Sequence, residues 1–139
     1  MNWKRFLVVL PIVCVVIILF DYIYNFIFLQ EAFMKNSQYW RTPEQMKSLI
    51  ILGWIVMVLC ITIISLLFIQ SGKTGIYNGL KFGFLTGLLL FLLVYGFTTI
   101  VPWPACLLIA WAGQWFANSI ILGFLFGWLY KKKGSALKR

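Results

Sequence analysis

Long apolar stretches separated by short polar ones make up most of the chain. A helix that crosses a bilayer needs about 20 consecutive, mostly apolar residues. The alternation of apolar and polar positions that is typical of membrane β-strands does not occur in these stretches. The pattern therefore predicts an all-α, polytopic membrane protein with four transmembrane helices, at about residues 6–29, 47–69, 80–101 and 105–130.

The borders of these stretches carry helix start and stop signals. The segment Thr42–Gln45 combines an N-cap residue, a proline at the first helical position and a capping-box glutamine, so the second helix is expected to begin near Pro43. Two prolines at 102 and 104 predict a turn before the fourth helix, and residues 30–46 are expected to form the one long loop. Short connections make neighbouring helices antiparallel, so residues 1–139 are expected to form a single four-helix bundle.

The distribution of basic residues predicts how the bundle is oriented. Short loops that carry more Lys and Arg remain on the cytoplasmic side of a membrane. One side is expected to hold Lys4, Arg5, Lys73, Lys81, Lys131, Lys132, Lys133, Lys138 and Arg139. The other side is expected to hold only Lys35, Arg41 and Lys47. Both termini are therefore predicted to be cytoplasmic, in a multi-pass protein of a bacterial-type inner membrane.

The composition also indicates a membrane protein, and it affects how the net charge is interpreted. The chain is 63% hydrophobic and 11% charged, which lies outside the range of soluble domains. Its net charge of +9 does not indicate nucleic-acid binding, because the basic residues lie at the ends of apolar runs. The basic C-terminus is instead expected to favour anionic lipid. The first apolar run is longer than the core of a signal peptide, so a retained helix is expected.

Few residues could carry enzyme chemistry. The chain has no histidine, and its three cysteines, Cys14, Cys60 and Cys106, are far apart in sequence. Apart from Asp21, the acidic residues are Glu31 and Glu44, both in the expected outer loop. No nucleophile–base pair, metal-ligand spacing or phosphate loop is present. The sequence therefore predicts a protein that is not an enzyme and has no cofactor and no metal.

The carboxylate of Asp21, inside the first apolar run, is the main candidate for a functional group. An ionisable group at membrane depth is costly and marks a candidate functional site. Asp21 shares a helix face with Asn25, and Gln114 and Asn118 are likewise four residues apart in the fourth helix. At a rise of about 1.5 Å per residue, Asp21 and Gln114 are expected at similar depths in the outer half of the bundle. These four residues, together with Tyr95, form the predicted polar intramembrane site.

Two interpretations of this site remain open from the sequence. In one, Asp21 exchanges a proton or binds a cation between helices. In the other, Asp21 is a hydrogen-bonding residue that holds the bundle together or contacts a partner protein. Interhelical hydrogen bonds in membranes contribute only about 0.6 kcal/mol on average, so a structural role alone is a weak reason to place a carboxylate there.

Glycines recur every four residues in the third helix. Gly79, Gly83 and Gly87 place small residues on one face, and Gly123 and Gly127 do the same in the fourth helix. Small residues let helix backbones approach closely, and dispersion contacts then hold the helices together in lipid. The spacing predicts a tight crossing of the third and fourth helices. A contact between copies of the chain through the same glycines is the alternative.

The whole-chain pattern resembles that of small uncharacterised four-helix proteins of the bacterial inner membrane. The residues that carry the resemblance are Asp21, Trp40 in the first loop, the glycine-stepped third helix, and Pro102 and Pro104 before a Trp-containing helix. It implies a fold and a compartment, with no activity attached. Four-helix multidrug transporters share a single acid in the first helix, but this chain has a longer outer loop.

These observations predict a non-enzymatic integral membrane protein that acts through helix packing as an accessory or assembly component. Its expected partners are the lipid bilayer, a second copy of the chain or another membrane protein, and no nucleic acid. The alternative is a small oligomeric transporter or channel, linked to protons or cations, that uses Asp21.

Overall fold

The computed structural model describes residues 3–37, 43–72, 75–96 and 103–130, and no strand occurs among them. Four helices are long and apolar enough to cross a membrane, which confirms the predicted all-helical class. In chain order the elements are α1 (Trp3–Tyr24), the π-helical segment η1 (Asn25–Leu29), α2 (Gln30–Lys35), α3 (Pro43–Gln70), α4 (Ile76–Gly96) and α5 (Ala105–Leu129).

The first helical rod extends further than the sequence indicated. The elements α1, η1 and α2 form one continuous rod over Trp3–Lys35, so the predicted loop at residues 30–46 was too long at its start. Good helix formers fill the sequence of α2, and Glu31 forms an ion pair with Lys35 at 3.7 Å. An acid placed four residues before a base stabilises an exposed helix. Local propensity therefore continues the helix past the apolar run.

The other helix bounds follow local signals. Helix α3 begins at Pro43, as the capping sequence predicted. Helix α4 begins at Ile76, four residues before the predicted start, directly after Gly75 with its left-handed φ of 102°. The predicted end of this helix at residue 101 and the turn at Pro102 lie outside the described residues.

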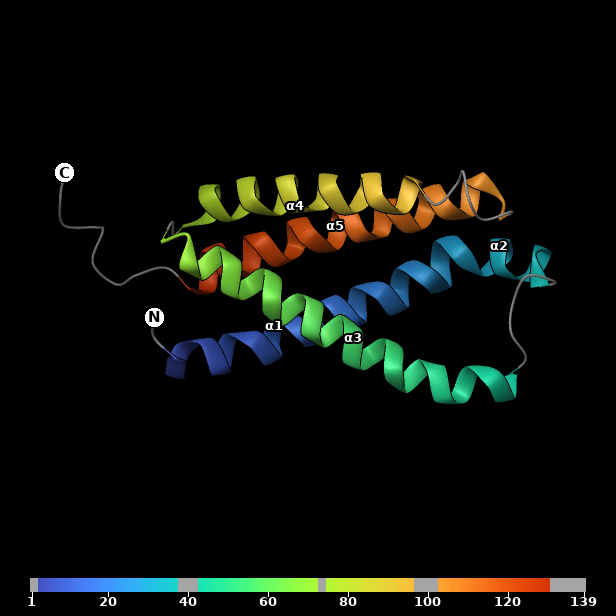
Figure 1. Cartoon of the computed structure of the whole chain (residues 1–139), viewed down its shortest axis with the longest axis horizontal. Coiled ribbons are helices and arrows are strands. Elements are labelled where there is room, and N and C mark those ends of the chain that lie inside the picture. The colour runs from blue at the N-terminus through green and yellow to red at the C-terminus, as the bar shows by residue number, and fades with distance from the viewer. Residues whose placement is uncertain (1–2, 38–42, 73–74, 97–102, 131–139) are drawn as a thin grey trace.

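The long helices alternate in direction (Figure 1). The starts of α1 and α4 and the ends of α3 and α5 lie together at one end of the molecule, called here the basic end. A contact across this end joins the first and last helices, because the Arg5 guanidinium lies 5.9 Å from the centre of the Tyr130 ring. The arrangement is therefore an antiparallel set of helices.

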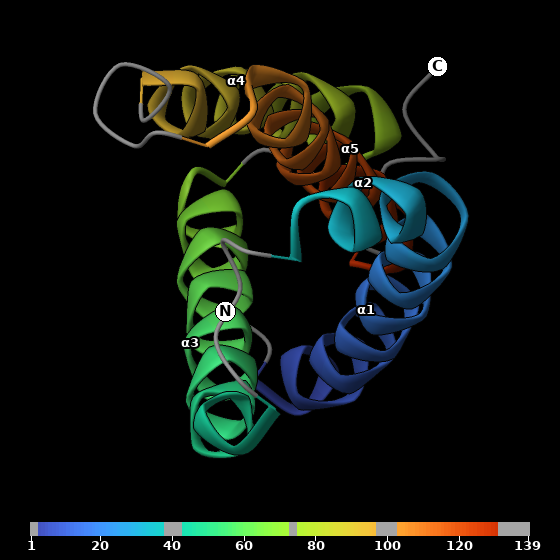
Figure 2. The same ribbon diagram turned by 90° about the vertical axis from the view of Figure 1, so that its right-hand side faces the viewer.

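Helices α4 and α5 form the most closely packed pair, and they lie side by side in both ribbon views (Figures 1 and 2). Gly79, Gly83 and Gly87 are buried against α5. A Cβ atom at Gly79 would overlap the carbonyl oxygen of Gly123, and one at Gly127 would lie 2.7 Å from the carbonyl oxygen of Gly75. The glycines of the two helices thus face each other within one chain.

The apolar core lies toward the basic end. It joins α1, α3 and α5 through Phe6, Val9, Val13, Ile17, Ile61, Phe68, Leu122, Phe126 and Tyr130. The first half of α3 stands apart from this core (Figure 1). No described side chain between residues 49 and 59 is buried. Helix α3 is therefore held mainly by its second half.

Candidate functional site

Asp21 joins α1 to α5 through its side chain. Its Oδ1 atom accepts a hydrogen bond of 2.6 Å from Nε2 of Gln114 and one of 2.7 Å from Nδ2 of Asn118. The donors are 93 and 97 residues away in the chain. Asp21, Gln114 and Asn118, called here the Asp21 cluster, therefore tie two distant helices together at one oxygen atom.

The spacing of the two amides explains why they converge. Gln114 and Asn118 are one helical turn apart on α5, so they share a face. Both are buried, with exposures of 8% and 6%. Asp21 is half-buried on the facing helix. Burial removes water as a competing partner, so each amide N–H needs an acceptor from within the protein.

One polar atom of the cluster lacks a partner. The Oδ1 atom of Asn118 is buried and accepts no hydrogen bond from the described residues. Asn118 also lines a cavity of about 20 Å³, together with Ser119 and apolar side chains of α1, α3, α4 and α5. A space of this size can hold about one water molecule. The cluster thus has acceptor capacity beyond the two bonds to Asp21.

Asn25 lies beside the cluster but engages the main chain. Its Nδ2 donates a hydrogen bond of 2.7 Å to the carbonyl oxygen of Asp21. An α-helix would offer that oxygen to the backbone N–H of Asn25, and the π-helical segment η1 begins at this residue. Asn25 therefore bonds to the main chain of Asp21 where the helix type changes, and among the described residues it forms no hydrogen bond with the carboxyl group.

Tyr24 adds a second link between the same helices. Its hydroxyl donates a hydrogen bond of 3.0 Å to the carbonyl oxygen of Ala110 on α5. A Cβ atom at Gly113 would meet this hydroxyl at 3.8 Å, an ordinary van der Waals contact. Sequence patterns could not predict this bond, because the acceptor is a main-chain group that no side-chain pattern marks.

Tyr95 does not join the cluster in the part of the chain that the structure describes. Its side chain is 49% exposed on α4, and its ring stacks on Phe91 with centroids 6.3 Å apart. A step of eight residues after Gly87 turns an α-helix by about 80° beyond whole turns. Tyr95 is therefore rotated away from the face that Gly87 presents to α5.

The cluster offers hydrogen bonds and one carboxyl group. Among the residues placed by the structure, no group of three or more His, Cys, Asp or Glu side chains could hold a metal ion. The side chains of Gln114 and Asn118 do not titrate, so Asp21 has no acid–base partner in the cluster. Its chemistry is limited to accepting hydrogen bonds, holding a proton or binding a cation.

Comparisons of the chain with protein-family models, with curated proteins and with solved structures find no match.

Proposed function

We propose that this chain is a multi-pass protein of a bacterial-type cytoplasmic membrane, with both termini on the cytoplasmic side. It works without catalysis, as an accessory or assembly component that acts through contacts between helices. The four long apolar helices support insertion, and the distribution of Lys and Arg supports the orientation.

The first half of α3 carries the proposal of an assembly role. Leu52, Ile55 and Leu59 expose more than half of their surface, and no described side chain between residues 49 and 59 is buried. Among the described residues of this half of α3, the apolar side chains are not buried by the chain's own helices. A second copy or another membrane protein would bury them, and dispersion contacts between helices would then stabilise the assembly.

Crosslinking tests this role. In a background with Cys14, Cys60 and Cys106 replaced by Ala, Leu52→Cys is treated with a bismaleimide in membranes. We expect a crosslinked product, whose mass by mass spectrometry identifies either a second copy or another protein. Leu89→Cys is the matched control, since Leu89 is 58% exposed on α4 while Leu52 is 54% exposed. Equal products from both variants, or none from Leu52→Cys, would contradict the proposal.

Ion- or proton-linked transport is the second candidate function. It is favoured by oxygen atoms of the Asp21 cluster that lack a donor among the described residues: Oδ1 of Asn118 and Oδ2 of Asp21. Such oxygens suit a proton or a hard cation. In proteoliposomes, transport through this site predicts a flux that Asp21→Asn abolishes without loss of assembly. Absence of flux in the unmodified protein would remove this candidate.

A further inference from the structure

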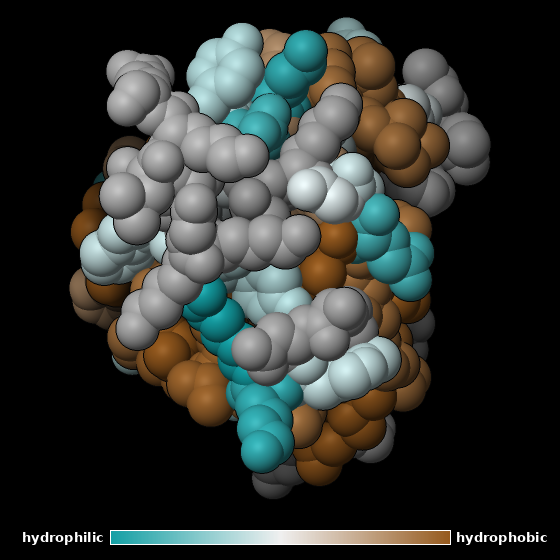
Figure 3. Space-filling model, turned by 90° about the vertical axis from the view of Figure 1, so that its left-hand side faces the viewer, coloured by the Kyte–Doolittle hydropathy of each residue, from teal (hydrophilic) through white to brown (hydrophobic). Residues whose placement is uncertain are grey.

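The acidic residues of the chain all lie away from its basic end (Figure 1). Its Asp and Glu residues number three, namely Asp21, Glu31 and Glu44. They lie in the second half of α1, in α2 and at the start of α3, away from the basic end (Figure 1). The basic end presents hydrophilic side chains beside apolar flanks (Figure 3). Within the described residues, Glu31 pairs with Lys35 at the other end of the molecule, and Lys81 forms no ion pair with an Asp or Glu.

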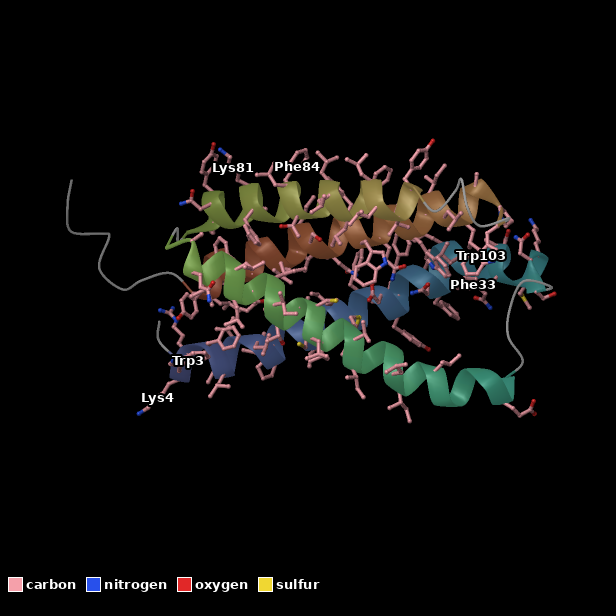
Figure 4. The ribbon with its side chains drawn as sticks, in the orientation of Figure 1. Trp3, Lys4, Phe33, Lys81, Phe84 and Trp103 are labelled. Atoms are coloured by element: carbon pink, nitrogen blue, oxygen red, sulfur yellow. The ribbon has the colours of Figure 1, made fainter. Side chains whose placement is uncertain are left out.

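Lys81 lines a groove on the surface of the molecule. The groove, of about 190 Å³, lies between the end of α3 and the start of α4. The side chain of Lys81 projects from α4 on the side away from α5 (Figure 4). The groove is lined at its polar rim by Ser71, Tyr77, Asn78 and Lys81, and at its apolar part by Phe68, Phe82 and Leu85.

The groove combines a cationic side chain with an apolar surface, and these match the anionic headgroup and the hydrocarbon chain of a lipid. Phe68 and Phe82 contact each other with ring centroids 5.3 Å apart and give the groove an apolar floor. Leu85 lies one turn beyond Lys81, which places apolar surface next to the cation along α4. A phosphate with an attached hydrocarbon chain matches this order of charge and apolar surface.

The depth of Lys81 suits a lipid headgroup. Lys81 lies five residues after the start of α4 at Ile76, or about 7.5 Å along the helix axis. The headgroup region on each side of a bilayer is about 5–7 Å thick. The ammonium group of a lysine at this depth reaches back to the headgroups. The start of α4 also carries the positive end of the helix dipole, which favours an anion at the same level.

We propose that the groove between α3 and α4 binds one anionic phospholipid of the membrane, with its phosphate at Lys81 and an acyl chain along Phe82 and Leu85. This inference rests on the proposed membrane insertion. It is separate from the basic C-terminal segment, because the groove is formed by residues of α3, α4 and their ends.

Native mass spectrometry of the protein in mild detergent tests the site, with palmitoyl-oleoyl phosphatidylglycerol as the probe. We expect a one-lipid adduct that Lys81→Gln weakens about fivefold, the effect of one basic group near a lipid surface. Lys81→Arg should retain the adduct. Lys4→Gln is the matched control, because Lys4 lies at the same end on another helix (Figure 4) and should leave binding unchanged.

Three further measurements distinguish a lipid site from a site for free phosphate, and from a failure of the proposed membrane insertion. Leu85→Trp, at a residue 57% exposed, should weaken the lipid adduct by filling the groove while far-UV circular dichroism stays unchanged. Inorganic phosphate should not displace the lipid. Equal losses for Lys81→Gln and Lys4→Gln, or displacement by inorganic phosphate, would overturn the lipid site. Recovery of the protein in the soluble fraction of cells would instead overturn the proposed membrane insertion.

Discussion

A single oxygen atom, Oδ1 of Asp21, receives the side-chain hydrogen bonds that join α1 to α5 in the Asp21 cluster. Because both donors are buried amides, removing the acceptor leaves two polar groups without a partner. An unpaired buried polar group costs about 1–3 kcal/mol, more than a membrane hydrogen bond usually contributes. The cost of leaving these amides unpaired, more than the strength of either bond, makes Asp21 difficult to replace by an apolar residue.

The two amides should respond differently to substitution. Gln114→Met removes one bond to Asp21 and should lower the free energy of unfolding by about 1 kcal/mol. Asn118→Leu removes a bond too, but it also removes the buried oxygen that lacks a partner, so a change near zero is expected. Unfolding in mixed detergent and dodecyl sulfate measures both. Equal losses would show that the oxygen of Asn118 has a partner, such as water in the adjoining cavity.

At the scale of elements, the α4–α5 hairpin owes its close approach to glycines on both helices. Gly83 faces the main chain of Ser119, and a Cβ atom there would overlap the Ser119 carbonyl oxygen. In lipid, such backbone contact supplies dispersion energy that replaces the hydrophobic effect. The hairpin therefore gives α1 a fixed surface on which Gln114 and Asn118 are held in place.

One alanine substitution in each of two helices tests this packing. Gly83→Ala should lower the free energy of unfolding by about 1–3 kcal/mol, because the added methyl group forces two main chains apart. Gly53→Ala in α3 is the control, since nothing lies within 4 Å of a Cβ atom there. Its expected effect is a gain of up to about 1 kcal/mol from helix propensity. Similar losses in both variants would mean that the glycines do not form the contact.

Sequence patterns predicted the elements better than the contacts between them. Pro43 marks the start of α3 because capping is local. The spacing of Gln114 and Asn118 marked a polar face, and similar depth suggested its meeting with Asp21. The π-helical segment at Asn25 and the bond from Tyr24 to Ala110 could not be predicted, since both depend on main-chain oxygens. Tyr95 was assigned to the polar site from its expected depth alone, without regard to the direction in which its side chain leaves the helix.

At the scale of the whole molecule, α3 differs from the other long helices because its second half is packed and its first half has no buried side chain among the described residues. The core joins α1, α3 and α5 near the basic end, whereas the first half of α3 stands apart from the other helices (Figure 1). The division suits a protein that inserts by itself and completes its packing with a neighbour. The basic end would then face the cytoplasm, where Lys81 can meet anionic headgroups.

Thiol labelling of intact cells tests this orientation. With Cys14 and Cys60 replaced by Ala, Cys106 near the start of α5 should react with a membrane-impermeant maleimide from outside. With all three native cysteines replaced by Ala, Ser71→Cys at the opposite end should react only after the membrane is permeabilised. The reverse pattern of labelling would place the termini outside.

The most direct test of the role of Asp21 compares Asp21→Asn with Asp21→Leu by unfolding in mixed detergent and dodecyl sulfate. Asparagine keeps an oxygen that can accept both amide bonds, so Asp21→Asn should change the free energy of unfolding by less than about 1 kcal/mol. Leucine offers no acceptor, so Asp21→Leu should lower it by about 2 kcal/mol or more. If Asp21→Asn is as damaging as Asp21→Leu, the carboxyl group itself is required, and a role as hydrogen-bond acceptor between α1 and α5 is contradicted.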